Sequence, residues 1–380
     1  MNKKLKILNI CSARIQYPGG AEKVIWELSH FISKQGHDVT ILQTDLYEKG
    51  HEWKAIENKD GVNIITCKND RFVKGFGYSR DFKKKLKEIW EDFDIIHVFG
   101  HGRFTTDYSL RFLKNKKPVI YTSNGFFHDK KYGRVKKLYN RFFKSALHNI
   151  VFCTALTELE RNEYLQLGVP DEKIRIIPAW IDSKKFKIRK IDRKKLLKKY
   201  GLEDKKTLLY VGRVHETRGA HHVVEAIKDL DFNFIIAGRD ADLSERIRNR
   251  VNDLGISKRV KLLGEVSDKQ LNEVYSFADA FVLFSAWEGF GIVVIEAMAS
   301  GLPVIVSDRG SLPTLVKNGE NGLIAKFPDV DELRDKIELL FSDKRLENKI
   351  RKNGLKFVKN FEYSNVAKRF ESLYYEAIGK

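Results

Sequence analysis

The stretch Ser285–Gly310, SAWEGFGIVVIEAMASGLPVIVSDRG, decides the fold that we predict for this chain. An apolar run, AFVLF at 280–284, precedes it and predicts a strand, and a glycine-rich turn then opens a short helix that runs to about Ser300. Gly301 suits a left-handed helix end, and Pro303 prevents the helix from continuing. The pattern therefore predicts a strand, a helix and a second strand, PVIVS.

Two carboxylates flank the start of this predicted helix. Glu288 stands just before its first turn, and Glu296 lies about two turns inside it. A glycine-rich helix start leaves backbone N–H groups and the positive end of the helix dipole available to a diphosphate. Each carboxylate can then accept hydrogen bonds from hydroxyl groups on its own side of the phosphates. The arrangement fits a nucleotide-sugar, in which a diphosphate joins a sugar to a ribose.

The composition indicates a globular chain with more than one core. A length of 380 residues fits two domains, and 42% apolar residues exclude a disordered chain. No run of about 18 apolar residues is present, and MNKKLKILNIC at the start lacks a cleavage pattern, so we expect a cytoplasmic protein. Cys11, Cys67 and Cys153 have neither disulfide nor metal-ligand spacing and are expected to be buried apolar residues.

The net charge of +19 calls for an anionic partner or reflects a general bias toward lysine. Positive charge is densest at 83–87 and at 130–144. The second segment, KKYGRVKKLYNRFFK, places aromatic and apolar residues at helical spacing between lysines and arginines. It predicts either a basic helix on an anionic membrane surface or a helix that packs on its own domain with solvated lysines. The inner face of the cell membrane is therefore a second candidate location.

The order of predicted elements restarts halfway along the chain. Strand-like runs alternate with amphipathic segments up to Pro178, and again from TLLYVGR at 207–213 onward. This alternation predicts two doubly wound parallel sheets with helices on both faces and ligands at the carboxyl ends of the strands. We place one domain at 1–182 and a second at 183–362, joined by a polar connection at 182–206. Further helices are expected at 21–35, 79–91, 330–342, 344–357 and 363–378.

The pattern of a strand, E-G-F-G and E-A-M-A-x-G-x-P-V-I resembles the nucleotide-sugar signature of the retaining glycosyltransferases of family 4. The resemblance covers essentially the whole chain, strongly in the second domain and loosely in the first. It implies an α/β protein with the GT-B fold, in which two Rossmann-like domains face a central cleft and the helix 363–380 packs back on the first domain. It also implies retaining transfer of a hexose from a UDP- or GDP-sugar to a lipid-linked or polysaccharide acceptor, as in polysaccharide and lipopolysaccharide biosynthesis, with no cofactor.

Two arginines follow the first strand of the second domain. The segment Val211–Gly219, VGRVHETRG, resembles the family's G-R-x-x-x-x-K-G, with Arg218 where lysine is usual. The resemblance assigns Arg213 and Arg218 to the diphosphate, where two fixed cations stabilise the charge of the leaving group. Because they supply this charge, we expect no metal site, and the D-x-D motifs at 229–231 and 240–242 look like helix caps or exposed acids.

The resemblance assigns further residues by their positions. Glu288 corresponds to the residue that binds sugar hydroxyls near the reaction, and Glu296 to the one that binds the ribose. The loop after RVKLL corresponds to the one that reads the base, and the loop YPGGAE, after the first strand, faces the diphosphate and the acceptor. The expected donor-binding residues are Gly19, Gly20, Gly212, Glu265, Val266, Gly289, Phe290, Gly291, Ile292 and Glu296, and the expected acceptor-side residues are Glu22 and His101.

One segment departs from the family pattern. Members commonly carry T-x-H-G where this chain reads Thr122-Ser123-Asn124-Gly125, and the family's histidine contacts the donor sugar. Asn124 retains hydrogen-bonding groups but cannot take up a proton. His128 is the other candidate for this role, and His97 and His101 are also expected to face the cleft. Whether Asn124 or His128 acts stays open, so both are candidate catalytic residues.

Other classes of protein fit the sequence less well. A GT-B sugar-nucleotide 2-epimerase would convert the donor without an acceptor. A dinucleotide oxidoreductase is disfavoured because SARIQYPGGAEK, after the first strand, lacks G-x-G-x-x-G, and G-F-G-I-V-V has Val294 where the third glycine belongs. A nucleic-acid-binding protein would account for the positive charge, but no recognition motif is present, so we expect no nucleic-acid partner.

Overall fold

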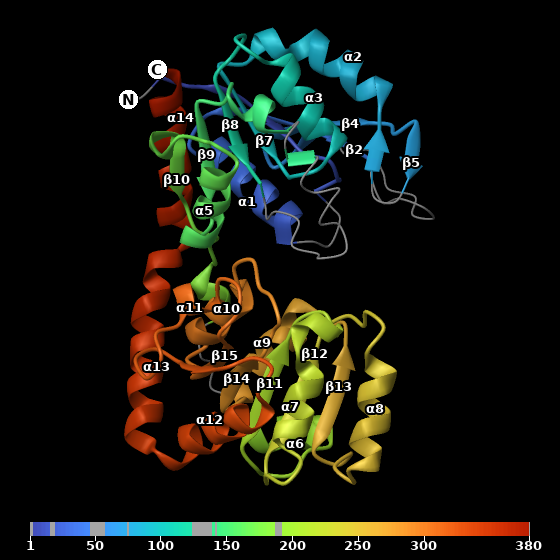
Figure 1. The fold of residues 1–380 in the computed structure, drawn as a ribbon, viewed down its shortest axis with the longest axis vertical. Coiled ribbons are helices and arrows are strands. Elements are labelled where there is room, and N and C mark those ends of the chain that lie inside the picture. Colours follow the sequence, from blue (N-terminus) through green and yellow to red (C-terminus); the bar gives the residue numbers. More distant parts are fainter. Residues whose placement is uncertain are drawn as a thin grey trace. The chain divides into compact units, whose positions relative to one another are not determined.

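A computed structural model describes residues 3–15, 20–45, 58–73, 76–123, 139–140, 143–186 and 192–379. Its contacts divide the chain into two compact units, each with its own parallel sheet (Figure 1). Unit 1 comprises Met1–Ala179 and Ser364–Lys380, and unit 2 comprises Trp180–Tyr363. The boundary that we expected between 182 and 183 lies close to this division. Two parallel-sheet, Rossmann-like units confirm the predicted fold class.

Unit 1 contains an eight-stranded sheet in the order β10-β9-β8-β7-β1-β2-β4-β3. Neighbouring strands are parallel except β3 and β4, which pair antiparallel at one edge. Because β1 lies between β7 and β2, the strand order reverses at β1. The strands are β1 (Lys6–Ile10), β2 (Asp38–Thr44), β3 (Asn58–Lys59), β4 (Val62–Cys67), β7 (Ile95–Phe99), β8 (Val119–Thr122), β9 (Phe152–Ala155) and β10 (Ile174–Ile176), and β5 (Arg71–Val73) and β6 (Phe76–Tyr78) form a separate antiparallel pair.

Unit 2 contains a six-stranded parallel sheet in the order β13-β12-β11-β14-β15-β16. This is the order of a dinucleotide-binding sheet, in which the first and fourth strands are parallel neighbours and the strand order reverses between them. Here these strands are β11 and β14. The strands are β11 (Thr207–Val211), β12 (Asn233–Ala237), β13 (Val260–Gly264), β14 (Ala280–Leu283), β15 (Val304–Ser307) and β16 (Leu323–Ala325).

Helices connect the strands of both sheets. In the described part of unit 1 they are α1 (Gly20–Lys34), α2 (Arg80–Ile89), α3 (Phe104–Phe112), α5 (Glu158–Gln166) and α14 (Tyr363–Ile378), whose first residue lies in unit 2. In unit 2 they are α6 (Arg193–Tyr200), α7 (Ala220–Ala226), α8 (Ser244–Asp253), α9 (Asp268–Phe277), α10 (Ile292–Ala299), α11 (Leu312–Leu315), α12 (Val330–Ser342) and α13 (Lys344–Val358). Over the described ranges, no helix is both long and apolar enough to cross a bilayer.

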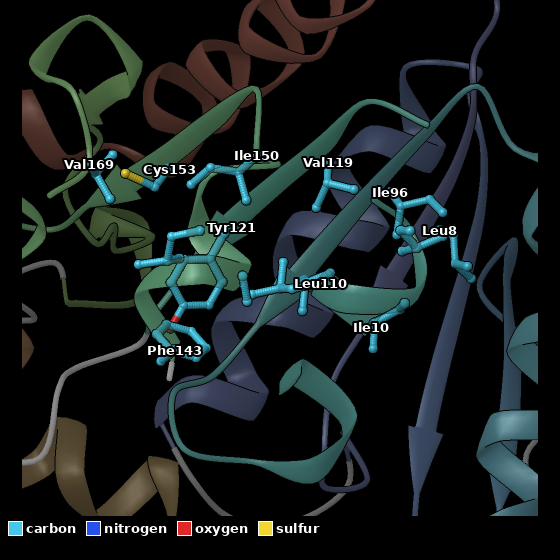
Figure 2. Packing of buried hydrophobic residues seen from close by; sticks show 14 of the residues in the cluster. Leu8, Ile10, Ile96, Leu110, Val119, Tyr121, Phe143, Ile150, Cys153 and Val169 are labelled. Carbon is cyan, nitrogen blue, oxygen red and sulfur yellow. The ribbon is translucent and has the colours of Figure 1, made fainter. Parts of the chain in front are cut away.

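Apolar side chains from adjacent strands form the core of unit 1 (Figure 2). Tyr121 and Phe143 lie within it, with ring centroids 5.7 Å apart. The three cysteines are buried and form no disulfide, which confirms their predicted role. Burial raises the pKa of the Cys67 thiol to about 12 and also raises the pKa values of the other two thiols.

The polar connection predicted at 182–206 includes a helix that the sequence analysis did not predict. It contains α6, which begins where the Asp192 side chain accepts a hydrogen bond from the Lys195 N–H at 3.0 Å. Arg193 Nη2 lies 2.9 Å from Asp279 Oδ2, and this ion pair fixes the helix within unit 2. Because Arg193 and Asp279 lie far apart in the sequence, local composition did not reveal the pair.

Helix α14 returns the end of the chain to unit 1, where the Tyr374 hydroxyl lies 2.9 Å from His97 Nδ1. His97 Nε2 lies 2.7 Å from Thr122 Oγ1, and the ring is fully buried. His97 therefore belongs to the core, and the prediction that it faces a ligand cleft is wrong. Its strand, β7, is central in the sheet and buried along its whole length, so its side chains meet covering helices on either side.

Burial of His97 predicts a loss of stability in acid. Burial lowers the pKa of His97 to about 3, whereas an unfolded histidine titrates near pH 6.5. Between these values the unfolded chain binds the extra proton, so this contribution is complete above pH 6.5 and falls by about 1.4 kcal/mol per pH unit below it. Urea unfolding at pH 7 and pH 5 should show a smaller pH dependence for His97→Gln than for the wild type.

The exposed His148 of the same unit supplies the control for this experiment. His148→Gln should keep the wild-type pH dependence. Equal pH dependence in the wild type and His97→Gln would contradict the buried, neutral state of this ring.

Candidate functional site

The residues predicted as catalytic in unit 2 lie on two loops at the carboxyl end of its sheet. One loop follows β11, and the other follows β14, its neighbour. The strand order reverses between these two strands, and the crevice beyond such a point is where open α/β sheets bind ligands. The sheet therefore brings together the two segments that carry Arg213, Arg218 and Glu288.

The loop after β11 is fixed by close backbone packing. A Cβ atom on Gly238 would lie 1.9 Å from the Gly212 carbonyl oxygen, so a side chain is excluded there. The Gly212 N–H donates to the Ala237 carbonyl at 3.0 Å. The buried Tyr210 hydroxyl donates to the Arg213 carbonyl at 2.8 Å. These contacts hold the Arg213 backbone at the strand end, while its side chain is exposed.

The loops after β11 and β14 are also in backbone contact with each other. Gly219 has a left-handed φ of 75°, and a Cβ atom there would lie 1.7 Å from the Phe284 carbonyl oxygen. The Ala286 N–H donates to the Thr217 carbonyl at 2.8 Å. Only glycine permits this approach. It brings the segment that ends in Arg218 beside the segment that carries Glu288.

Arg218 and Glu288 form an ion pair between Nη1 and Oε2. Their side chains keep 25% and 13% of their surface exposed, so both remain accessible. Burial raises the pKa of Glu288, while the charge of Arg218, the Gly289 N–H and the charge of Arg213 act in the opposite direction. The three residues predicted as catalytic in unit 2 therefore share one electrostatic environment.

Ser311 holds the backbone of Glu288 in place. The N–H and the hydroxyl of Ser311 both donate to the Glu288 carbonyl, at 2.9 and 3.0 Å. Gly310 precedes it with a left-handed φ of 59°, and a Cβ atom there would lie 2.3 Å from the same carbonyl oxygen. The sequence analysis did not identify this support, because nothing in the pattern S-D-R-G-S points to a partner so far back in the chain.

The start of α10 presents an open surface. Its N-cap, Gly291, has a left-handed φ of 93° and no side chain with which to cap the helix. Gly289 is exposed, and a Cβ atom there would meet nothing within 4 Å. Phe290 is buried against Phe361, with ring centroids 6.0 Å apart, while Ile292 is half-buried. Gly291 itself is buried, and a Cβ atom there would lie 3.1 Å from Leu312, so the open space before the helix lies at Gly289. N–H groups at a helix start beside such a space suit an anion.

Glu296 lies within α10 and is more deeply buried than Glu288, which precedes the helix. It is 7% exposed, and its Oε2 accepts a hydrogen bond from the Tyr275 hydroxyl at 3.1 Å. Tyr275 was not predicted from the sequence, because one tyrosine in an amphipathic helix is typical of core packing. The loop expected to read the base lies before α9, where Glu265 is exposed and Val266 is half-buried.

The D-x-D motifs behave as predicted. Asp240 lies just before α8, and its Oδ1 accepts from the N–H groups of Leu243 and Ser244 at 3.1 and 3.0 Å. Asp231 Oδ1 lies 2.7 Å from Lys205 Nζ in an exposed ion pair. Both are structural acids at the ends of elements.

In unit 1, Gly20 opens α1 and Glu22 lies half-buried in its first turn. Burial raises the pKa of Glu22, and the charge of Arg103 opposes the shift. His101 is buried just after β7, with Nδ1 3.2 Å from the Tyr121 hydroxyl. Gly19, Asn124, His128 and most of the basic segment 130–144 lie outside the described residues.

Two parallel-sheet units, one of which carries a basic and acidic cluster at its switch point, define an enzyme of the GT-B fold. Residues 18–185 match the model of Glycosyltransferase Family 4, and residues 192–357 match that of Glycosyl transferases group 1. The chain belongs to the group 1 glycosyltransferases of the family 4 type and is a glycosyltransferase.

Individual relatives agree with this assignment. The chain is 30% identical to an uncharacterized glycosyltransferase of Methanocaldococcus jannaschii, over 88% of this chain and 89% of the relative. It is 25% identical to a GDP-mannose:cellobiosyl-diphosphopolyprenol alpha-mannosyltransferase of Xanthomonas oryzae, over 75% of each. Its fold is similar to that of Anabaena HepE solved in complex with UDP, with a TM-score of 0.81 and 19% identity, over 97% of this chain and 99% of that one.

Alanine substitutions at two glycines near Glu288 test the packing around its backbone. Gly310→Ala should lower the free energy of unfolding of unit 2 by roughly 2–4 kcal/mol, because its backbone is left-handed and a Cβ atom would meet the Glu288 carbonyl. Gly289→Ala should change it by less than about 1 kcal/mol, because that position is open. Denaturant unfolding of the two variants measures the difference. Similar losses in both would contradict the packing around Glu288.

Proposed function

We propose that the chain is a retaining hexosyltransferase that moves a hexose from a UDP- or GDP-sugar to the hydroxyl of a lipid-linked or polysaccharide acceptor. The observation that carries the proposal is the cluster of Arg213, Arg218 and Glu288 around the open start of α10. The cluster combines cations and backbone N–H groups for a diphosphate with a carboxylate for sugar hydroxyls.

The proposed donor contacts both members of the Arg218–Glu288 ion pair. A guanidinium has five N–H donors, so Arg218 can keep contact with the carboxylate and still bind phosphate oxygens. The carboxylate of Glu288 has acceptor capacity left for the hydroxyls of the sugar. Arg213, exposed at the end of β11, supplies the second positive charge. Both charges act most strongly when the diphosphate departs, so they favour the transition state over the bound donor.

The proposed transfer needs no separate general base. The bond between the sugar C1 atom and the diphosphate oxygen breaks, and the acceptor oxygen forms its bond to C1 on the same face. The proton of the acceptor hydroxyl passes to a phosphate oxygen of the departing diphosphate, so charge and protons balance. The arginines neutralise the product diphosphate, and we therefore propose that the reaction is independent of metal ions.

The nucleotide and the acceptor are proposed from the relatives and the charge of the chain. The Xanthomonas relative is named for GDP-mannose and a diphosphopolyprenol-linked acceptor, and HepE binds UDP. A lipid-linked acceptor lies at a membrane, and the net charge of +19 favours an anionic surface. We propose that the protein works at the cytoplasmic face of the membrane through the basic segment 130–144.

Arginine variants test the proposed site. A panel of UDP- and GDP-sugars first identifies the donor by thermal stabilisation, since a ligand at one hundred times its Kd adds about 2.7 kcal/mol. Arg213→Ala and Arg218→Ala should then lower kcat by roughly a hundredfold or more without changing the melting temperature greatly. Arg218→Lys, which restores the residue usual in the family, should recover part of the loss. Turnover is measured as release of the nucleoside diphosphate.

Arg246→Ala is the matched control, since Arg246 is exposed on α8 and pairs with Glu216 at 3.0 Å. It should keep wild-type turnover, and EDTA should change nothing. Full activity in both alanine variants, or its loss with EDTA, would contradict the leaving-group assignment. Conversion of the donor without an acceptor would instead indicate a 2-epimerase.

Vesicle sedimentation tests the membrane proposal. Near an anionic surface each lysine contributes about 1 kcal/mol, so binding should weaken steeply with salt and with four charge reversals in the basic segment. The variant changes Lys130, Lys131, Lys136 and Lys137 to glutamate. The control places the same charge change on the exposed face of α13 and the turn that follows it, at Lys349, Lys352, Lys356 and Lys359. Equal loss of vesicle binding in the two variants, or no sedimentation of the wild type at low salt, would contradict the proposal that the basic segment binds the membrane specifically.

A further inference from the structure

Glu296 is an unusual residue for its surroundings. It is the single charged residue in the sequence of α10, IVVIEAMA, and it is buried with its neighbours Ile295 and Ala297. Burial of a carboxylate is costly unless hydrogen-bond donors stabilise it. The residue is therefore poorly suited to packing alone, and its position depends on the groups that donate to it.

Tyr275 of α9 is such a donor. Its hydroxyl lies 3.1 Å from Glu296 Oε2 and 3.4 Å from the Val293 carbonyl oxygen. A carbonyl and an ionised carboxylate both only accept, so the hydroxyl proton must point to one of them, and Glu296 is the nearer. Burial, and then the charge of Glu296, raise the pKa of Tyr275 well above its usual value, so the hydroxyl keeps its proton.

The ring of Tyr275 is held in place by aromatic neighbours. Tyr275 is 1% exposed, and the ring of Phe186 meets it edge-on at 5.8 Å. Phe281 of β14 lies 6.3 Å away on a third element. The hydroxyl therefore reaches Glu296 from a fixed point, and its hydrogen bond limits the rotation of that carboxylate. A carboxylate accepts at about four positions, so the bond from Tyr275 does not by itself exhaust the acceptor capacity of Glu296.

We propose that Tyr275 is a positioning residue that orients Glu296 toward the ribose hydroxyls of the donor nucleotide. The inference rests on the proposed function, because it requires a nucleotide at the start of α10. Recognition of the ribose would then depend on the Tyr275 hydroxyl of α9. The same helix begins directly after Glu265 and Val266, so one element supports both the loop proposed to read the base and the carboxylate proposed to read the ribose.

Tyr275→Phe tests the proposal through discrimination between ribose and dideoxyribose. Isothermal titration measures the Kd of UDP and GDP and of their 2′,3′-dideoxy analogues. The wild type should bind the ribose form of its own nucleotide roughly tenfold or more tightly than the dideoxy form, as expected for hydrogen bonds to a charged group. In Tyr275→Phe the ribose form should weaken by roughly fivefold or more while the dideoxy form keeps its Kd, so that the ratio moves toward one.

Tyr200→Phe is the matched control. The Tyr200 hydroxyl donates to Glu273 Oε2 at 3.2 Å, and Glu273 also belongs to α9. The control thus removes the same kind of hydrogen bond from the same helix, away from Glu296, and should leave the discrimination unchanged. Glu296→Gln should lose the discrimination by itself, and the double variant with Tyr275→Phe should lose no more, because Tyr275 acts through Glu296.

Each outcome decides the proposal. Full discrimination in Tyr275→Phe, or equal weakening of both nucleotide forms, overturns it, since the second pattern is that of general destabilisation. If Tyr275→Phe does not fold, full discrimination in Glu296→Gln overturns it equally. A wild type that binds UDP or GDP without discriminating overturns this inference alone. A wild type that binds neither nucleotide overturns the proposed function as well.

Discussion

The backbone contact between the loops after β11 and β14 is the constraint on which the site depends. Gly219 lies against the Phe284 carbonyl at a distance that excludes any side chain, and the Ala286 N–H bonds to the Thr217 carbonyl. A sheet of this order places the two loops side by side, but it does not set their separation. The glycine sets it, and it brings the Arg218 guanidinium to the half-buried carboxylate of Glu288. The ion pair of the site therefore depends on a glycine, a residue without a side chain.

Much of the fold could be predicted from the sequence, because the signals were local and strong. The three closing helices were expected at 330–342, 344–357 and 363–378, and they occur as α12, α13 and α14 with nearly the same bounds. Each combines an apolar stripe with clear end signals. The sequence also predicted the left-handed end of α10 at Gly301, because glycine just after a helix is typical of that backbone, and its φ is 75°.

The remaining features depended on partners distant in the sequence. Helix α6 is highly charged, and its anchor on Asp279 lies in another part of unit 2. The burial of His97 depends on Tyr374, near the end of the chain. The Tyr210 hydroxyl bonds to the loop after β11, and the Tyr275 hydroxyl bonds to Glu296 of α10. A tyrosine in a strand or an amphipathic helix gives no local sign of such a role. The sequence could therefore suggest candidate site residues, but it could not reveal the distant groups that hold them in place.

Because α14 belongs to unit 1, the two units are completed in a fixed order during synthesis. Unit 2 is one continuous stretch, Trp180–Tyr363, whereas unit 1 needs the last residues to be complete. During synthesis on the ribosome, the partner that Tyr374 provides for His97 emerges only after all of unit 2 has been made. Domains generally fold as units while the chain grows. Unit 1, which is made first, is thus completed last, and a chain truncated before α14 would lack both the Tyr374 hydroxyl that pairs with His97 and the rings of Phe370 and Tyr374 that pack against it.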